Sequence, residues 1–288
     1  MGKPALSFEI ATTVTQVESW RTKTSGRTVG FVPTMGALHE GHMALVDTAR
    51  KTCDQVIVSI FVNPLQFGPN EDFGKYPRSL EQDFLICQKF GVDAVFHPSI
   101  DIIYPQGETE TTTVQPPAQL ISGLCGAFRP GHFIGVATVV NKLFNIVQPD
   151  CAFFGEKDYQ QLQVIKHMAD DLNMNVKIIG VPTMREEDGL ALSSRNVYLS
   201  EAQRKLAPTL YAALSEAKSA ILSGTSISAA VAIAKSRITS LDDVTLQYLE
   251  CCNPRTLQPV SDPQAPCRIL VAAKYGDVRL IDNLVVNP

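Results

Sequence analysis

Short runs of β-branched and other apolar residues alternate with amphipathic stretches through the first 181 residues of this chain. The run from Gln55 to Val62 is almost continuously apolar, as expected for a strand that is covered on both faces. Strands that alternate with helices predict a Rossmann-like, doubly wound parallel sheet with helices on both of its faces. The other expected strands are Thr28–Pro33, Asp93–Phe96, Cys151–Phe154 and Asn175–Val181.

Helices are expected between these strands because apolar residues recur there at helical spacing. The segment Asn63–Arg78 is instead a long loop rich in proline and glycine, and loops of that length are usually functional or disordered. Residues 98–130 are irregular, with one short strand expected at Thr111–Val114. The expected helices are Thr12–Lys23, Gly41–Lys51, Ser79–Phe90, Gly135–Val147 and Asp158–Asp171.

The order of elements changes after Ser200, where two helical stretches come first and strands follow. This order predicts a smaller C-terminal α+β domain. We therefore expect two domains, residues 1–183 and residues 184–288, with their boundary near Pro182–Asp188. The expected elements are helices at Glu201–Leu222 and Ser226–Ile238 and strands near Val244–Cys251, Ile269–Ala273 and Val278–Ile281.

Composition excludes several classes of function. Only 19% of the residues are charged and the formal net charge is -4, so no broad basic surface indicates nucleic-acid binding. The seven cysteines are odd in number and form no C-x-x-C pair, so reduced thiols are the simplest interpretation. The N-terminus lacks the pattern of a secretory signal, and no apolar run approaches the ~18 residues that span a bilayer. We expect a cytoplasmic protein that binds neither nucleic acid nor membrane.

A glycine-containing turn with two histidines follows the first expected core strand. The stretch Val32–His42 reads VPTMGALHEGH and leads into an expected helix. Gly41 lets a ligand approach the backbone, and the free amides at a helix start bind anions such as phosphate. His39 and His42 are placed to donate hydrogen bonds to that anion. The alternative is that both are polar surface residues of a turn.

Better-known motifs are excluded. The zinc-protease pattern H-E-x-x-H has its histidines four residues apart on a helix, whereas His39 and His42 are three apart. Gly68–Lys75 has five residues between its glycines, where a P-loop has four, and Tyr76 follows instead of Ser or Thr. No G-x-G-x-x-G follows the first core strand, so the common nucleotide-binding signatures are absent from the sequence.

Two further polar stretches fit a phosphate site. Gly155–Asp158 (GEKD) follows a strand, and Lys157 is a compact charge suited to phosphate oxygens, although the aspartate alone reads as a helix N-cap. Ser193, Ser194 and Arg195 follow the domain junction, where two hydroxyls and a guanidinium can close on a triphosphate. The alternative there is a solvated linker with a capping serine.

Amide and guanidinium side chains complete the candidate set. Asn63 and Gln66 lie at a strand end in an otherwise apolar stretch, and amides typically fix a carboxylate or hydroxyl in an apolar pocket. Arg129 and Arg78 are either anion contacts or structural residues. Since ligands bind beyond the carboxyl ends of parallel strands, we expect the histidines, the amides and Lys157 to be brought together.

Taken together, these stretches resemble the pantothenate synthetase (pantoate–β-alanine ligase) family of the H-x-G-H nucleotidyltransferase superfamily. The resemblance extends to NPLQFGPNEDF, KYPR, RPGHF, FGEKDYQQL, DGLALSSRN and the terminal LVAAKYGDVRLIDN, so it covers nearly the whole chain. It implies the ATP-dependent condensation of (R)-pantoate with β-alanine to pantothenate, through a pantoyl adenylate, with release of AMP and pyrophosphate. It also implies Mg²⁺ bound with ATP, a homodimer, an N-terminal nucleotide- and pantoate-binding domain and a C-terminal lid.

The resemblance also implies roles for individual residues. His42, often assigned as a proton donor in the family, is joined in catalysis by His39, Lys157, Ser193, Ser194 and Arg195. Gln66 and Gln161 are the pantoate contacts, with Gln66 also near β-alanine; Asn63 is grouped with them, and Asp83 is expected at the metal. The ATP-binding residues implied are Met35, Gly36, Ala37, Leu38, His39, Glu40, Gly41, His42, Gly155, Glu156, Lys157, Asp158, Met184, Leu192, Ser193, Ser194 and Arg195.

Elementary chemistry qualifies this picture. The attacking carboxylate is already ionised, so the first step needs alignment and charge neutralisation, not a general base. His42 can donate a proton only as an imidazolium. Two alternatives stay open: another H-x-G-H cytidylyl- or adenylyltransferase, which gives no reason for the NPLQF loop, and a nucleotide-binding regulatory module without turnover.

Overall fold

The computed structural model describes residues 6–69 and 71–287, which form two compact units. Among these residues, unit 1 comprises those up to Pro116 together with 129–156 and 164–182. Unit 2 comprises 117–128, 157–163 and the residues from Thr183 onward. Two segments that precede Thr183 in the sequence, 117–128 and 157–163, therefore belong to the same unit as the C-terminal residues.

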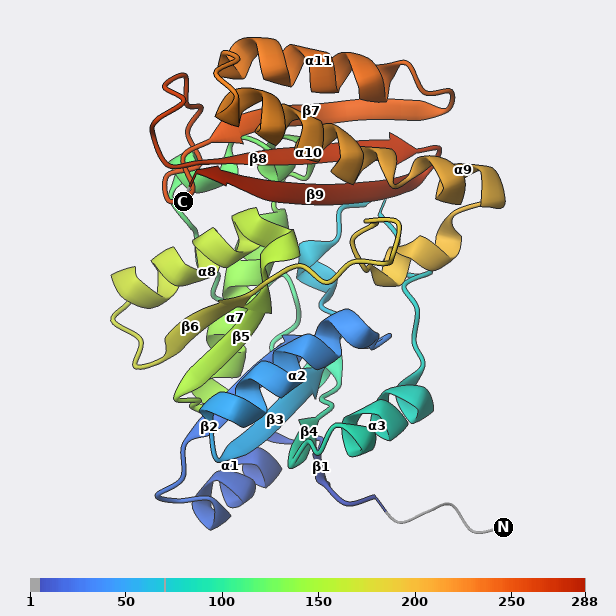
Figure 1. Ribbon diagram of the computed structural model, residues 1–288. Helices are drawn as coiled ribbons and strands as arrows, with labels where there is room; N and C mark the ends of the chain where they lie inside the picture. The colour runs from blue at the N-terminus through green and yellow to red at the C-terminus, as the bar shows by residue number, and fades with distance from the viewer. Residues whose placement is uncertain (1–5, 70, 288) are drawn as a thin grey trace. The chain divides into compact units, whose positions relative to one another are not determined.

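Unit 1 contains a six-stranded sheet in which every neighbouring pair is parallel, as predicted (Figure 1). The predicted strand at Thr111–Val114 is wrong, because the Val114 amide donates instead to the Thr138 hydroxyl at 3.0 Å. A three-residue edge strand, β1, was missed because it carries no apolar run. In order across the sheet, the strands are β1 (Glu9–Ala11), β4 (Ala94–Phe96), β3 (Gln55–Ile60), β2 (Val29–Thr34), β5 (Cys151–Gly155) and β6 (Lys177–Val181).

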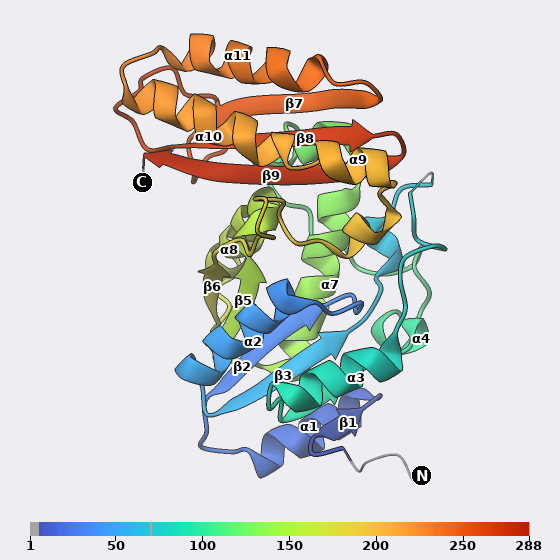
Figure 2. The ribbon, with the colours of Figure 1, turned by 45° about the vertical axis from the view of Figure 1, so that its right-hand side comes forward.

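Side chains of the strands alternate between two apolar layers. Val32 packs in the cluster that contains residues of α2 (Glu40–Thr52) and α3 (Leu80–Lys89), and both helices are visible in Figure 2. Its neighbour Phe31 points the other way, and its ring contacts Phe144 of α7 at a centroid distance of 6.3 Å. This period of two confirms a sheet covered on both faces. The remaining helices that begin in unit 1 are α1 (Val14–Lys23), η1 (Pro64–Gln66), α4 (Ile100–Ile103), α7 (His132–Val147) and η2 (Glu156–Asp158).

The strand order places a topological switch between β2 and β5. These strands are adjacent, but the chain leaves β2 toward β3 and β4 and returns to β5 only after α7. The connections that follow β2 and β5 therefore depart in opposite directions, and this leaves space for a ligand beyond the carboxyl ends of the strands. The Val32–His42 stretch occupies one of these two positions.

Unit 2 is built on a three-stranded antiparallel sheet with two helices packed on it, as predicted. The predicted helix Glu201–Leu222 is two helices, because Pro208 lacks a backbone N–H and α9 ends at Leu206. No helix within residues 6–69 and 71–287 has both the length and the apolar character needed to cross a membrane. The other elements are α5 (Ala118–Ile121), α6 (Cys125–Phe128), α8 (Tyr159–Asp171), η3 (Ser194–Tyr198), α9 (Glu201–Leu206), α10 (Thr209–Leu222), α11 (Ile227–Thr239), β7 (Val244–Cys252), β8 (Cys267–Tyr275) and β9 (Val278–Asn287).

Candidate functional site

The turn after β2 has two successive residues in left-handed conformations. Gly36 has φ +79° and Ala37 has φ +49°, and an alanine there costs roughly 1–2 kcal/mol. The backbone amide of Ala37 donates to Oδ2 of Asp83 at 3.0 Å, and that of Leu38 donates to Oδ1 at 2.8 Å. A carboxylate that accepts two consecutive amides offsets this cost and fixes the turn in front of the histidines.

Asp83 lies in the first turn of α3 and is only 1% exposed. Its Oδ1 also accepts the Ser79 hydroxyl at 3.3 Å. A Cβ on Gly36 would lie 3.0 Å from Oδ2 of Asp83, a tight contact at a residue with φ +79°, so glycine suits the point where the turn meets the carboxylate. Asp83 is thus an anchor of the turn. Its expected role as a metal ligand stays a prediction, and it would require the same oxygens to serve amides and metal together.

His39 and His42 cap the helix that follows the turn. His39 is the N-cap of α2, and its Nδ1 accepts the Gly41 amide at 3.1 Å. Nδ1 of His42 accepts the His39 amide at 3.3 Å, and the two ring centroids are 4.1 Å apart. Because both Nδ1 atoms accept, each neutral ring carries its hydrogen on Nε2. Protonation at Nδ1 would break the cap, so these rings are arranged to donate hydrogen bonds from Nε2.

The amides predicted at the end of β3 contact each other. Asn63 is 1% exposed and donates to Oε1 of Gln66 at 3.2 Å and to the Gly135 carbonyl at 3.2 Å. The Tyr104 hydroxyl donates to Oδ1 of Asn63 at 2.6 Å, and burial raises the Tyr104 pKa and keeps it a donor. The Nε2 group of Gln66 donates to the Met35 sulfur at 2.9 Å, which is a weak acceptor. Gln66 is therefore oriented and can exchange this partner for a carboxylate or hydroxyl.

Gly135 makes this arrangement possible. A Cβ at this position of α7 would lie 2.2 Å from the Leu65 carbonyl oxygen, closer than any contact allows. The helix can approach η1 closely only because residue 135 has no side chain. The sequence identified Gly135 merely as the start of a helix.

Arg129 and Glu71 were not recognised as partners from the sequence. Nε and Nη2 of Arg129 donate to the two oxygens of Glu71 at 2.7 and 2.6 Å, and its Nη1 lies 2.9 Å from Nε2 of His132. His132 Nδ1 in turn lies 2.8 Å from the Gln66 carbonyl oxygen. Burial pushes the Glu71 pKa up, but hydrogen bonding and the charge of Arg129 outweigh it and lower the pKa. The structure favours the structural alternative for Arg129.

In unit 2, a hairpin carries the predicted nucleotide residues. The Met184 carbonyl accepts the Leu192 amide at 3.0 Å, and Arg185 and Ala191 form an antiparallel bridge. Ser193 then caps η3, where its hydroxyl accepts the Arg195 amide at 3.3 Å. The capping serine of the alternative interpretation is therefore present, on a structured hairpin.

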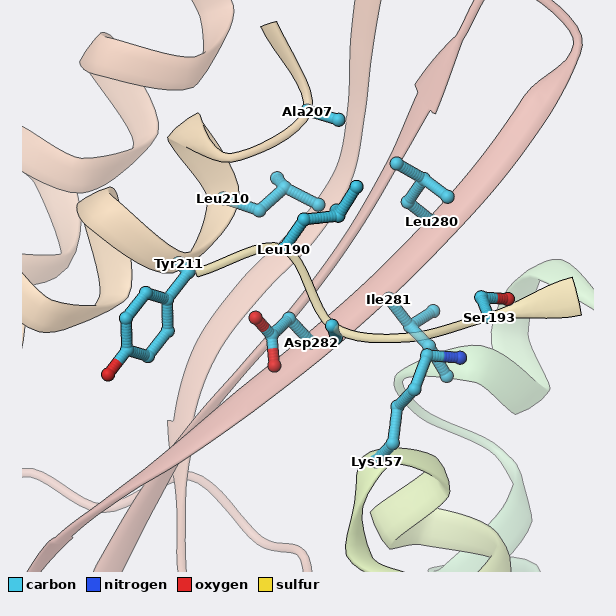
Figure 3. A pocket seen from close by; sticks show the side chains of 10 residues that line it. Lys157, Leu190, Ser193, Ala207, Leu210, Tyr211, Leu280, Ile281 and Asp282 are labelled. Carbon is cyan, nitrogen blue, oxygen red and sulfur yellow. The ribbon is translucent and has the colours of Figure 1, made fainter. Parts of the chain in front are cut away.

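Lys157 and Ser193 line the same pocket in unit 2. Figure 3 shows the Lys157 side chain extending past Ile281 toward the segment that carries Ser193. The Lys157 ammonium lies 3.9 Å from the Asp158 carboxylate, at the edge of ion-pair range. Lys157 and Ser193 are thus close enough in unit 2 to line one pocket. The other lining residues are Leu190, Ala191, Ala207, Leu210, Tyr211, Leu280, Ile281 and Asp282.

Comparison with known proteins decides what this arrangement belongs to. A family model described as pantoate-beta-alanine ligase matches residues 9–285. The chain belongs to the pantoate–β-alanine ligase family.

Relatives in this family match over almost their full length. The pantothenate synthetase of Thermus thermophilus is 50% identical over 276 residues, which cover 96% of this chain and 99% of that protein. A crystal structure of pantothenate synthetase from the same organism superposes with a TM-score of 0.93 at 48% identity, covering 98% of this chain and 100% of the other. The pantoate-beta-alanine ligase of Francisella tularensis, described as complexed with beta-gamma ATP and beta-alanine, gives a TM-score of 0.79 at 38% identity and covers 97% and 98%.

The candidate residues of this pantoate–β-alanine ligase fall into two groups, one in each unit. Within unit 1 the structure joins Met35 with Gln66, and within unit 2 it joins Lys157 with Ser193. Unit 1 holds Met35, Gly36, Ala37, Leu38, His39, Glu40, Gly41, His42, Asn63, Gln66, Asp83, Gly155 and Glu156. Unit 2 holds Lys157, Asp158, Gln161, Met184, Leu192, Ser193, Ser194 and Arg195.

Sequence reasoning missed the residues that hold these groups in place. Tyr104 lies in a segment without periodicity, so no pattern could have selected it. Gln160 donates to the Leu120 and Gly123 carbonyls and accepts the Cys125 amide, beside the predicted Gln161. The Q-Q pair offered a signal, but only the helix register separates the inward residue from its neighbour.

The described residues do not fit a protein cage for a divalent cation. Within residues 6–69 and 71–287, no three His, Cys, Asp or Glu side chains are grouped so that they could hold a metal ion. Both oxygens of Asp83 already accept amides. A magnesium ion in this family member would therefore depend on ligands supplied by the nucleotide and water.

Proposed function

We propose that this protein joins (R)-pantoate to β-alanine in an ATP-dependent reaction that forms pantothenate, AMP and pyrophosphate. The observation that carries this conclusion is the family match over residues 9–285, with relatives of that activity at about 50% identity. ATP and β-alanine are named in the structure of the Francisella tularensis relative. The oriented amide of Gln66 supports a substrate that presents a carboxylate and hydroxyls.

In the proposed first step, a pantoate carboxylate oxygen attacks the α-phosphorus of ATP and the bond to pyrophosphate breaks. The nucleophile is already charged, so catalysis consists of alignment and of neutralising the charge on pyrophosphate. We assign neutralisation to Lys157 and Arg195, with the Ser193 and Ser194 hydroxyls as further donors. Gln66, Gln161 and Asn63 are assigned to pantoate, with Gln66 also near β-alanine.

We assign His39 and His42 as hydrogen-bond donors toward the phosphates. Their Nδ1 atoms accept helix-capping amides, and this supports donation from Nε2 by neutral rings. A proton-donor role for His42 would require the imidazolium, and an Nδ1 proton would displace the His39 amide. The remaining predicted residues of the turn, the Gly155–Asp158 stretch, Met184 and Leu192 are assigned to nucleotide binding.

In the proposed second step, the neutral amine of β-alanine attacks the acyl carbon of pantoyl adenylate. The C–N bond forms, the bond to AMP breaks and a proton leaves the nitrogen. Mg²⁺ entering with ATP, a homodimeric state, a cytoplasmic location and domains at 1–183 and 184–288 belong to the same proposal.

A pantoate-dependent exchange of labelled pyrophosphate into ATP tests this function. The ligase predicts exchange only when pantoate is present, because pyrophosphate is returned only from the adenylate. Another H-x-G-H nucleotidylyltransferase would exchange with a different co-substrate, and a non-catalytic nucleotide-binding module would not exchange at all. Absence of exchange from folded protein supplied with ATP, Mg²⁺ and pantoate would refute the proposal.

A further inference from the structure

Two adjacent residues of β9, Asp282 and Asn283, are buried and polar, and each is 4% exposed. They belong to the terminal stretch LIDN, to which the proposed function gives no role. Resting on that function, we propose that Asp282 and Asn283 are positioning residues. They hold in place the two segments of unit 2 that carry Ser193 and Lys157, residues that we assign to the phosphates of ATP. Asp282 positions the hairpin that carries Ser193, and Asn283 positions the backbone at Lys157.

Asp282 acts on the hairpin through Arg185. Nη1 and Nη2 of Arg185 donate to the two Asp282 oxygens at 2.6 and 2.8 Å. The same guanidinium donates to the Gly189 carbonyl at 3.0 Å and stacks on the Tyr211 ring at 3.9 Å from its centroid. A bidentate pair of this kind fixes direction as well as distance. Asp282 therefore determines where the hairpin runs just before Ser193.

Asn283 acts on the segment that carries Lys157. Its Oδ1 accepts Nη1 of Arg268, and its Nδ2 donates to the Lys157 carbonyl at 2.9 Å. Because a guanidinium can only donate, Arg268 forces the amide oxygen toward itself and the NH₂ toward Lys157. Arg268 also stacks on Tyr159 at 3.8 Å from the ring centroid, two residues after Lys157. The start of α8 is thus held by one contact from Asn283 on β9 and one from Arg268 on β8.

The strand β9 therefore fixes the position of both segments, the one that carries Ser193 and the one that carries Lys157. Successive side chains leave a strand on opposite faces, so neighbours can reach different segments without any flexible connection between them. The backbone N–H of Asn283 donates to Oδ1 of Asp282 at 2.7 Å, and both residues are paired with β8 in the sheet. A cation and a hydroxyl that neutralise the same pyrophosphate must keep a fixed separation, and a rigid strand supplies it.

A purely stabilising role does not explain these polar residues. Replacing a buried ion pair by apolar residues is often neutral or favourable for stability, so such pairs are poor stabilisers. The positions contacted by Asp282 and Asn283 are instead those that precede Ser193 and include Lys157. The contacts of Asp282 and Asn283 are therefore best explained by the positions that they impose on the segments carrying Ser193 and Lys157.

Asn283→Asp tests the role of Asn283. This variant keeps the oxygen that accepts the hydrogen bond from Arg268, but it removes the NH₂ group that donates to the Lys157 carbonyl. The matched control is Asn287→Asp on the same strand, where Nδ2 donates to the Gln264 carbonyl at 3.0 Å away from the pocket. We expect Asn283→Asp to weaken ATP binding by about tenfold in calorimetry and to change AMP binding by less than about twofold. The control should change neither affinity.

Asp282→Asn tests the role of Asp282. It also keeps the proposal testable if Asn283→Asp fails to fold. Its control is Glu216→Gln, which removes the exposed ion pair with Arg237 in the same unit. We expect Asp282→Asn to lower the rate of adenylation about tenfold or more, while β-alanine still reacts with supplied pantoyl adenylate at near parental rate. Equal losses in both half-reactions, or equal losses of ATP and AMP binding, would overturn the inference.

The parent protein separates this inference from the proposed function. Without pantoate-dependent exchange in the parent, the function is refuted, whereas the difference between ATP and AMP binding still reports on Asp282 and Asn283. With exchange in the parent and parental behaviour in both variants, the function stands and the positioning role is refuted.

Discussion

Asp83 and Leu38 are 45 residues apart in the sequence, yet Oδ1 of Asp83 accepts the Leu38 amide at 2.8 Å. Through this bond and the neighbouring one from Ala37, a carboxylate on α3 shapes the turn that leads to both histidines. The proposed phosphate site in unit 1 therefore depends on a residue that need not touch the nucleotide.

Asp83→Asn should slow adenylation by about tenfold to a hundredfold, because the new NH₂ group faces a backbone N–H and distorts the turn. The Mg²⁺ concentration that gives half-maximal rate should stay unchanged. A magnesium titration of the exchange reaction measures both quantities. The control is Asp101→Asn at an exposed position of α4. A large increase in the Mg²⁺ requirement would show that Asp83 is a metal ligand and not an anchor.

Lys157→Ala should lower the adenylation rate by about a hundredfold, because its charge is most useful as pyrophosphate departs. The KM for pantoate should change by less than about threefold. Steady-state kinetics of the exchange reaction with each substrate varied measures both. Lys205→Ala, which removes an exposed lysine of α9, is the control. Comparable losses in rate and in pantoate binding would contradict the assignment.

Gln66→Ala should raise the KM for pantoate by about tenfold, because it removes an oriented amide from a buried position. The KM for ATP should stay within about twofold of the parent. Initial rates measured over a range of pantoate concentrations decide this, and an unchanged KM would remove Gln66 from the substrate site.

Glu71→Gln should destabilise unit 1 at neutral pH by about 1–3 kcal/mol, because Arg129 loses its charged partner. The Glu71 pKa lies below its ordinary value of 4.5 in the folded protein. The pair therefore contributes fully above about pH 4.5, and the contribution is lost as pH falls through the folded-state pKa. Urea unfolding of parent and variant between pH 7 and pH 3 should show two curves that converge at low pH.

Glu216→Gln is the control for this experiment, because its ion pair with Arg237 is exposed and should contribute less than about 1 kcal/mol. A difference between the Glu71 variant and the parent that persists unchanged to pH 3 would show that packing, and not charge, stabilises the loop.

Buried cysteines should resist alkylation in the folded protein. Burial raises the pKa of Cys53, Cys87 and Cys252 to about 12, so almost no thiolate is present at neutral pH. Cys151 is half-buried and should be modified first by iodoacetamide. Peptide mass spectrometry over a time course gives the order, and early labelling of Cys87 would contradict the packing around α3.

The sequence by itself determined the classes of structure. Alternation of apolar runs with amphipathic stretches determined a parallel sheet, because the helices that connect parallel strands also cover both faces of their sheet. The order of elements after Ser200 determined the second fold, and the glycine before His42 marked a helix start. These features depend on neighbours in the chain, so local composition is sufficient to reveal them.

Only the tertiary structure decided which side chains hold the candidate residues. Asp83 meets Ala37, Tyr104 meets Asn63, and Arg185 meets Asp282 across 46, 41 and 97 residues. The three-residue strand β1 likewise exists because β4 is present to pair with it. A buried polar group takes the partner that folding places within reach, and sequence spacing carries no information about that distance. The kind of chemistry is therefore visible in local sequence motifs, whereas the exact geometry of the site comes from contacts between distant segments.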